Sequence, residues 1–130
     1  MTGNNILLDT NIVIEFFKGN ANVVAQLETK DTLKIPFVVL GELYLGAYRS
    51  SNTPKHIDQI NGFLDKCDVI AANAETADNY AIIKTQLLKK GKPIPENDIW
   101  IAAIAKQNGL ILITRDKHFN EINGIKIDAW

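Results

Sequence analysis

Four acidic residues stand in mainly apolar stretches and are the candidates for chemistry: Asp9, Glu42, Asp98 and Asp116. Carboxylate oxygens are the ligands that Mg²⁺ and Mn²⁺ prefer, whereas zinc sites are typically built from histidines and cysteines at characteristic spacings. Two carboxylates about 4 Å apart near a protein surface repel by about 4 kcal/mol, so a cluster must take up protons, move apart or hold a cation. If the four meet, the pattern predicts a site for Mg²⁺, with Mn²⁺ as the alternative.

Each of these carboxylates also has a structural alternative. Asp9 is placed to cap a following helix, Asp98 to interact with a helix N-terminus, and Asp116 is a residue type common in turns. Glu42 is harder to explain, because its neighbours three and four positions away on a helix are apolar or glycine. An unpaired buried carboxylate costs several kcal/mol, roughly. The alternatives for Glu42 are a salt bridge or exposure on a small polar window.

Short apolar runs alternate with helical patterns along the chain. The expected strands lie at 5–9, 33–35, 68–71, 110–114 and 125–127. The expected helices are one ending at Gly19, then 22–30, 36–50, one starting at Pro54, 74–90 and 98–107. Strands separated by helices predict an α/β fold with a parallel sheet and helices on both faces. Ligand sites in such sheets lie beyond the carboxyl ends of the strands, where Asp9 and Asp116 are expected together.

The composition sets the broad class of the protein. The 130 residues predict one domain over 1–130, and no apolar run approaches the length of a membrane span. The polar start of the sequence predicts no signal peptide, and the lone Cys67 suits a reducing cytoplasm. A net charge of −1 argues against binding nucleic acid through phosphate contacts alone. Local basic patches or metal ions would have to supply the attraction.

Four short segments together resemble the PIN-domain ribonucleases and, within them, the VapC-type toxins of bacterial toxin–antitoxin pairs. They are 7–11 (Leu-Leu-Asp-Thr-Asn), 40–47 (Leu-Gly-Glu-Leu-Tyr-Leu-Gly-Ala), 95–103 (Pro-Glu-Asn-Asp-Ile-Trp-Ile-Ala-Ala) and 112–119 (Leu-Ile-Thr-Arg-Asp-Lys-His-Phe). Each segment is weak alone, but their order and spacing over the whole chain are specific.

The resemblance implies a magnesium- or manganese-dependent endoribonuclease that cleaves tRNA or another structured RNA. Asp9 and Asp98 would be the principal metal ligands, with Glu42 and Asp116 completing the acidic site. The polar groups around the site and in contact with RNA would be Thr10, Asn11, Thr114, Arg115 and Lys117. Many relatives carry a further acidic residue after the last motif aspartate, where this sequence has Lys117, His118 and Asn120. We expect His118 to be an ordinary surface residue, and its place two residues after Asp116 leaves a minor role in substrate contact as the alternative.

The resemblance also implies partners. A VapB-type antitoxin would block the acidic site, for which a guanidinium is well suited. A homodimer is expected as well, and either interface could use Tyr44, Tyr48 and Trp130. A non-catalytic PIN-like module that binds RNA or protein is the alternative function. A phosphatase with an aspartate nucleophile is disfavoured, because Asp9-Thr10-Asn11 lacks the second aspartate that such a site uses as its acid.

Overall fold

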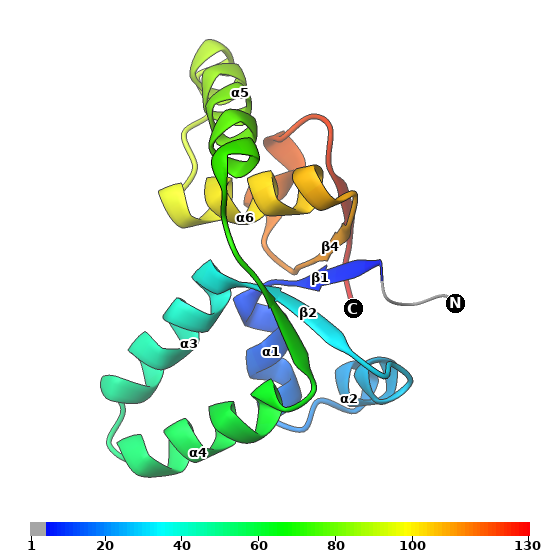
Figure 1. Cartoon of the computed structure of the whole chain (residues 1–130), viewed down its shortest axis with the longest axis vertical. Helices are drawn as coiled ribbons and strands as arrows, with labels where there is room; N and C mark the ends of the chain where they lie inside the picture. The colour runs from blue at the N-terminus through cyan, green and yellow to red at the C-terminus, as the bar shows by residue number, and fades with distance from the viewer. Residues whose placement is uncertain (1–4) are drawn as a thin grey trace.

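Parallel strands form the centre of the molecule in the computed structural model, which describes residues 5–130 (Figure 1). Within that range the strands are β1 (Ile6–Leu8), β2 (Leu33–Pro36), β3 (Cys67–Ile70), β4 (Ile111–Ile113) and β5 (Lys126–Asp128). One ladder has the order β1-β4-β5, the other pairs β2 with β3, and β2 lies beside β1. The expectations that the chain starts without a signal peptide and that the domain begins at residue 1 fall on residues 1–4, outside the described part.

Helices cover both sides of the strands. They are α1 (Thr10–Phe17), α2 (Ala21–Glu28), α3 (Phe37–Tyr48), α4 (Thr53–Leu64), α5 (Ala74–Lys90) and α6 (Glu96–Asn108). Figure 1 shows α5 and α6 on one side and α1 to α4 on the other. The α/β class with a parallel sheet between helices, predicted from the sequence, is therefore confirmed. None of the helices within 5–130 is long and apolar enough to cross a membrane.

Local capping explains where α5 begins and where both α5 and α6 end. The Asn73 side chain accepts from the Thr76 backbone N–H while the Thr76 hydroxyl accepts from the Asn73 N–H, which forms a capping box. Gly91 and Gly109 close the two helices in the left-handed conformation, with φ values of 65° and 62°. These signals are local, and the bounds of α5 match the expected helix at 74–90.

Three differences from the expected elements bear on the candidate site. The strand expected over 5–9 ends at Leu8, because Asp9 leaves the strand to cap α1. The helix expected from Asp98 begins at Glu96, so that Asp98 lies within its first turn. Residues Lys117–Glu121, for which the sequence predicts no element, form a short 3-10 helix, η1.

The core anchors these elements through fully buried apolar side chains. Leu7 and Leu112 are Cα partners in the β1–β4 ladder and are completely buried. Most of α6 is also enclosed, from Ile99 through Ala105 with the exception of Trp100. The chain segments that carry Asp9 and Asp98 are therefore fixed by packing on both sides of the sheet.

Truncating the core beneath the site should destabilise the fold. Leu112→Ala removes fully buried methyl groups, and we expect the free energy of unfolding in urea to fall by roughly 2–5 kcal/mol. Ile82→Ala on α5 is the control, because Ile82 is 50% exposed and should change stability much less. Equal losses for the two variants would contradict the placement of Leu112 in the core.

Candidate active site

Asp9 lies at the carboxyl end of β1, enclosed by hydrogen-bond donors. Its side chain accepts from the Thr114 hydroxyl at 2.7 Å and from the Thr10 backbone N–H at 2.8 Å. Asp9 is only 4% exposed, and this burial raises its pKa. The Thr114 and Thr10 bonds work in the opposite direction, while the negative charges of Glu42 and Asp116 raise the pKa further. The group is thus held in a place where its negative charge lacks full compensation.

Asp98 reaches the same place from the first turn of α6. Its side chain is 12% exposed. Burial raises the pKa of Asp98 to about 6, with further increases from the charges of Asp116, Asp9 and Glu42, and a hydrogen bond from His118 lowers it in part. Charges raise the pKa of a carboxyl group in this way only when they are near it. Asp98 therefore lies near Asp116, Asp9 and Glu42.

Asp116 is fixed at the end of the segment that follows β4. Its backbone N–H donates to the Thr114 hydroxyl at 3.0 Å, and its side chain accepts from the His118 backbone N–H at 2.9 Å, which caps η1. Asp116 therefore has the turn role proposed from the sequence. It also belongs to the group of four carboxylates, Asp9, Glu42, Asp98 and Asp116, which we call the acidic cluster. The His118 Nδ1 atom lies 3.1 Å from Asp116 Oδ1 and 3.4 Å from Asp98 Oδ2.

Glu42 approaches from α3, on the opposite side of the sheet from α6. It is half-buried and accepts hydrogen bonds from the Thr10 hydroxyl and, at 3.3 Å, from the Asn97 side-chain amide. The face of α3 that looks core-facing in the sequence therefore opens at Glu42 onto the edge of the site. Neutral donors, rather than the salt bridge considered from the sequence, hold its carboxylate in the described structure.

The supporting polar residues divide into two groups. Thr10, Asn11 and Thr114 belong to the hydrogen-bond network of the carboxylates, and Asn11 also accepts from the Arg115 backbone N–H at 3.1 Å. The Arg115 side chain points elsewhere, donating to the Trp130 carbonyl at 2.8 Å and lying 3.5 Å from a carboxylate oxygen of Glu15. These are orienting and packing contacts, so any contact of Arg115 with RNA remains a prediction.

The sequence did not assign Asn97 to the site, and it left His118 at most a minor role in substrate contact. Asn97 reaches Glu42 across 55 residues of sequence, and His118 contacts two of the four carboxylates. For His118, the sequence signal was its position two residues after Asp116. A tight turn at Asp116 directs the His118 side chain back towards the end of β4. For Asn97, adjacency to Asp98 at a helix start was the only such signal.

A divalent cation fits this donor set. Ligand atoms of Asp98, Asp116 and His118 all lie within 4.8 Å of one another. Asp9 and Glu42 are outside this group, although their negative charges raise the pKa of Asp98. Two of the carboxylates have pKa values raised by burial and by the others' charges, which is a repulsion that a bound cation would relieve. Oxygen donors of this kind suit Mg²⁺ or Mn²⁺.

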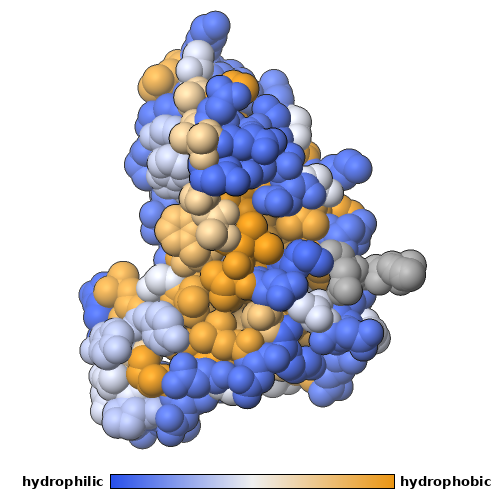
Figure 2. Space-filling model, viewed as in Figure 1, coloured by the Kyte–Doolittle hydropathy of each residue, from blue (hydrophilic) through white to orange (hydrophobic). Residues whose placement is uncertain are grey.

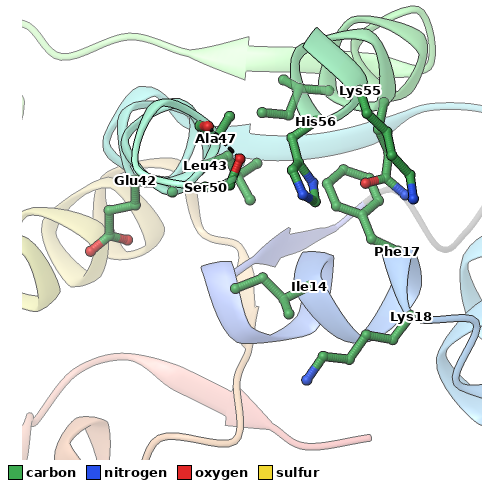
Figure 3. Close-up of a pocket in the computed structure, with 12 residues that line it drawn as sticks. Ile14, Phe17, Lys18, Glu42, Leu43, Ala47, Ser50, Lys55 and His56 are labelled. Atoms are coloured by element: carbon green, nitrogen blue, oxygen red, sulfur yellow. Dashed lines mark hydrogen bonds between the residues drawn. The ribbon is translucent and has the colours of Figure 1, made fainter. Parts of the chain in front are cut away.

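An apolar pocket adjoins the acidic cluster between α1, α3 and α4 (Figure 3). Its volume is about 390 Å³. The lining includes Ile14, Phe17, Leu43 and Ala47, and Glu42 lies at one end with its carboxylate turned away from these apolar side chains. A ligand could therefore occupy this pocket and reach a carboxylate at the same time.

Comparison with known proteins identifies the family. The model described as the PIN domain matches residues 6–125. The chain belongs to the PIN-domain family. It is 33% identical over 129 residues to the ribonuclease VapC1 of Haemophilus influenzae, across 95% of this chain and 96% of that protein. It is 31% identical over 127 residues to the tRNA(fMet)-specific endonuclease VapC of Shigella flexneri, with the same shares covered.

Solved structures agree with this assignment. A DNA-bound VapBC from Salmonella typhimurium superposes with a TM-score of 0.90 at 28% identity, covering 98% of both chains. The resemblance to VapC-type PIN nucleases, predicted from the four sequence segments, is therefore confirmed, and this PIN domain is a nuclease of that group.

The raised pKa of Asp98 predicts how stability depends on pH in the metal-free protein. Between the ordinary value of 3.8 and about 6, the folded state holds a proton that the unfolded chain releases, so stability should fall as pH rises through this range. A shift of about two units corresponds to at most roughly 3 kcal/mol. Urea unfolding in the presence of a chelator, from pH 4 to 8, measures this fall.

Asp98→Asn should make that fall in stability shallower, because amide and carboxylate are similar in shape but only the carboxylate titrates. The raised pKa of Asp9 should leave part of the fall in place. Asp58→Asn on α4 changes an exposed carboxylate and is the matched control. A profile for Asp98→Asn as steep as that of the unaltered protein would contradict the assignment of the pH dependence to Asp98.

Proposed function

We propose that this PIN domain is an endoribonuclease that depends on Mg²⁺, with Mn²⁺ as an alternative ion, and is the toxin of a VapBC-type pair. One observation carries the proposal: ligand atoms of Asp98, Asp116 and His118 lie within 4.8 Å of one another, and the negative charges of Asp9 and Glu42 also act on Asp98. The relatives named as ribonuclease VapC support the same reaction class. The four carboxylates are the proposed metal ligands and catalytic residues.

The chain's own residues orient this site. Thr114 and the Thr10 backbone direct Asp9, while Thr10 and Asn97 direct Glu42. When bound, a divalent ion at such a site activates water and neutralises charge that develops on the phosphate oxygens. No serine or cysteine nucleophile is required for this chemistry. The hydrogen bonds hold the carboxylates in place, and this limits the reorganisation that cation binding requires.

The proposed substrate is a tRNA or another structured RNA, and the Shigella relative named as specific for tRNA(fMet) supports this class. Lys117 is exposed beside Asp116 at the start of η1 and is the better-placed cation for a phosphate contact. Lys84, by contrast, is paired with Glu96. The proposed location is the cytoplasm, where RNA is available and the free Cys67 would remain reduced.

A VapB-type antitoxin is the proposed protein partner, since the structural neighbours include VapBC complexes. The apolar pocket of Figure 3 suits such a partner, because an apolar segment placed there could direct a basic side chain towards Glu42. This arrangement would neutralise the carboxylates and block substrate at once.

The proposed homodimer has a candidate surface of its own. Phe37, Leu45, Ala72 and Trp100 line a shallow hollow of about 520 Å³. Figure 2 shows apolar side chains gathered between α3 and α6 on the face in view. Exposed apolar patches of this kind mark protein interfaces. Of the aromatics singled out in the sequence, Tyr48 is exposed, whereas Tyr44 and Trp130 pack partly against the core.

Cleavage assays on total RNA and purified tRNA test the catalytic proposal. We expect cleavage in Mg²⁺ or Mn²⁺, loss on chelation, and a fall of more than about 100-fold in Asp98→Asn, since removing even a group that only supports a metal ligand costs 10–100-fold. Asp58→Asn should cleave normally.

Two outcomes would contradict the proposal in different ways. Equal cleavage by the unaltered protein and Asp98→Asn would show that this site is not responsible. Metal binding without cleavage of any RNA would favour the non-catalytic binding module.

Leu45→Glu tests the dimer surface. Leu45 is 56% exposed, so the substitution should leave the monomer folded while placing a charge in the proposed interface. We expect light scattering after gel filtration to show a dimer for the unaltered protein and a monomer for the variant at micromolar concentration. Leu88→Glu, at a 67% exposed leucine on α5, should remain dimeric. A monomeric unaltered protein would contradict the dimer.

A further inference from the structure

His118 is an exposed residue, but its imidazole lies against two of the four carboxylates. Its Nδ1 atom is 3.1 Å from Asp116 Oδ1 and 3.4 Å from Asp98 Oδ2. One ligand atom from each of these three residues lies within 4.8 Å of the other two. We call Asp98, Asp116 and His118 the mixed triad.

The backbone fixes the imidazole in this position. The His118 N–H donates to Asp116 Oδ1, and η1 begins at Lys117 with Asp116 as its cap. The next residue, Phe119, is completely buried and anchors the short helix in the core. His118 itself remains 52% exposed in its side chain, so the ring stands at the mouth of the cluster. Its direction follows from the same turn that places Asp116.

A single ring nitrogen cannot serve both carboxylates well. Nδ1 carries either one N–H or one lone pair, so it has one directed interaction to offer to two acceptors at similar distances. A cation among the three groups would satisfy all of them, because each would contribute one donor atom. Ligand atoms around a single Mg²⁺- or Mn²⁺-sized ion are separated by roughly 3–4 Å, given metal–oxygen distances near 2.1 Å. The spacing in the mixed triad is compatible with that arrangement after small movements.

We infer that His118 is a metal ligand of this chain and that its Nδ1 atom shifts the site's preference towards Mn²⁺ over Mg²⁺. This inference rests on the proposed metal site. Mg²⁺ strongly favours oxygen donors, whereas later divalent ions accept imidazole nitrogen readily. A site made of carboxylates alone has no nitrogen donor that favours Mn²⁺ over Mg²⁺. The expected preference for Mn²⁺ therefore depends on the Nδ1 atom of His118.

The chain offers a clean experiment because it contains two histidines. His56 lines the apolar pocket and not the mixed triad, so it provides the matched control (Figure 3). Tag-free protein would be loaded with Mn²⁺ at pH 8, and electron spin-echo envelope modulation would detect nitrogen bonded directly to the metal. We expect ¹⁴N modulation in the unaltered protein and in His56→Asn, and its loss in His118→Asn.

Competition between the two ions gives a second measurement. Calorimetric titration of Mn²⁺ and Mg²⁺ should show the ratio of their affinities falling about tenfold in His118→Asn, the lower end of the effect of losing a group that tunes a metal site. His56→Asn should keep the ratio of the unaltered protein. Circular dichroism and thermal melting verify that each variant is folded.

The outcomes separate the ligand assignment from the site itself. The unaltered protein could bind Mn²⁺ tightly without ¹⁴N modulation, while Asp98→Asn loses the binding. This result would overturn His118 as a ligand but would support the carboxylate site. Mn²⁺ binding that Asp98→Asn does not weaken would overturn the proposed metal site. The unaltered protein decides the first question, so the inference remains testable even if a variant fails to fold.

Discussion

The parallel pairing of β1 with β4 is the constraint on which the site depends. The register sets Leu8 opposite Ile113, and the Asp9 N–H continues the ladder by donating to the Ile113 carbonyl at 3.0 Å. The next residue on each strand, Asp9 and Thr114, therefore emerges at the same edge, where the hydroxyl meets the carboxylate. Thr114 in turn receives the Asp116 N–H, so one hydroxyl links two acidic residues. A slip of one residue in this ladder would invert the side chains of one strand relative to the other, so that Asp9 and Thr114 would point to opposite faces of the sheet.

Repulsion among the carboxylates is offset by neutral donors only in part. Hydroxyl, amide and backbone N–H groups hold Asp9 and Glu42 in position, yet burial and mutual charge still raise the pKa values of Asp9 and Asp98. Part of the folding free energy is therefore used to maintain an unfavourable charge arrangement. Such an arrangement is ready for a divalent ion, and binding of that ion stabilises the folded state by mass action. The same excess negative charge explains why a cationic side chain from a partner would be an effective inhibitor.

With a net charge of −1, the chain has no overall excess of positive charge to attract RNA. Arg115, which directly precedes Asp116, is occupied by the Trp130 carbonyl and by Glu15, and Lys84 is paired with Glu96. Attraction for a phosphate would then come mainly from the proposed metal site, beside which Lys117 is exposed. A positive charge confined to one place positions the scissile phosphate there. It adds less to the overall affinity for nucleic acid than many phosphate contacts spread over a basic surface would.

The sequence by itself determined the elements and the four acidic candidates, because apolar runs, caps and glycine stops are local signals. The run Ile6-Leu7-Leu8 before Asp9 shows both the strand and its end without reference to the rest of the chain. Only the tertiary structure decided which groups surround the carboxylates. Thr10 meets Glu42 across 32 residues, and Thr114 meets Asp9 across 105. Such contacts depend on strand register and on how helices cross the sheet, and no local pattern encodes them. For the same reason His118, which the sequence presents as an ordinary surface residue, is found among the carboxylates.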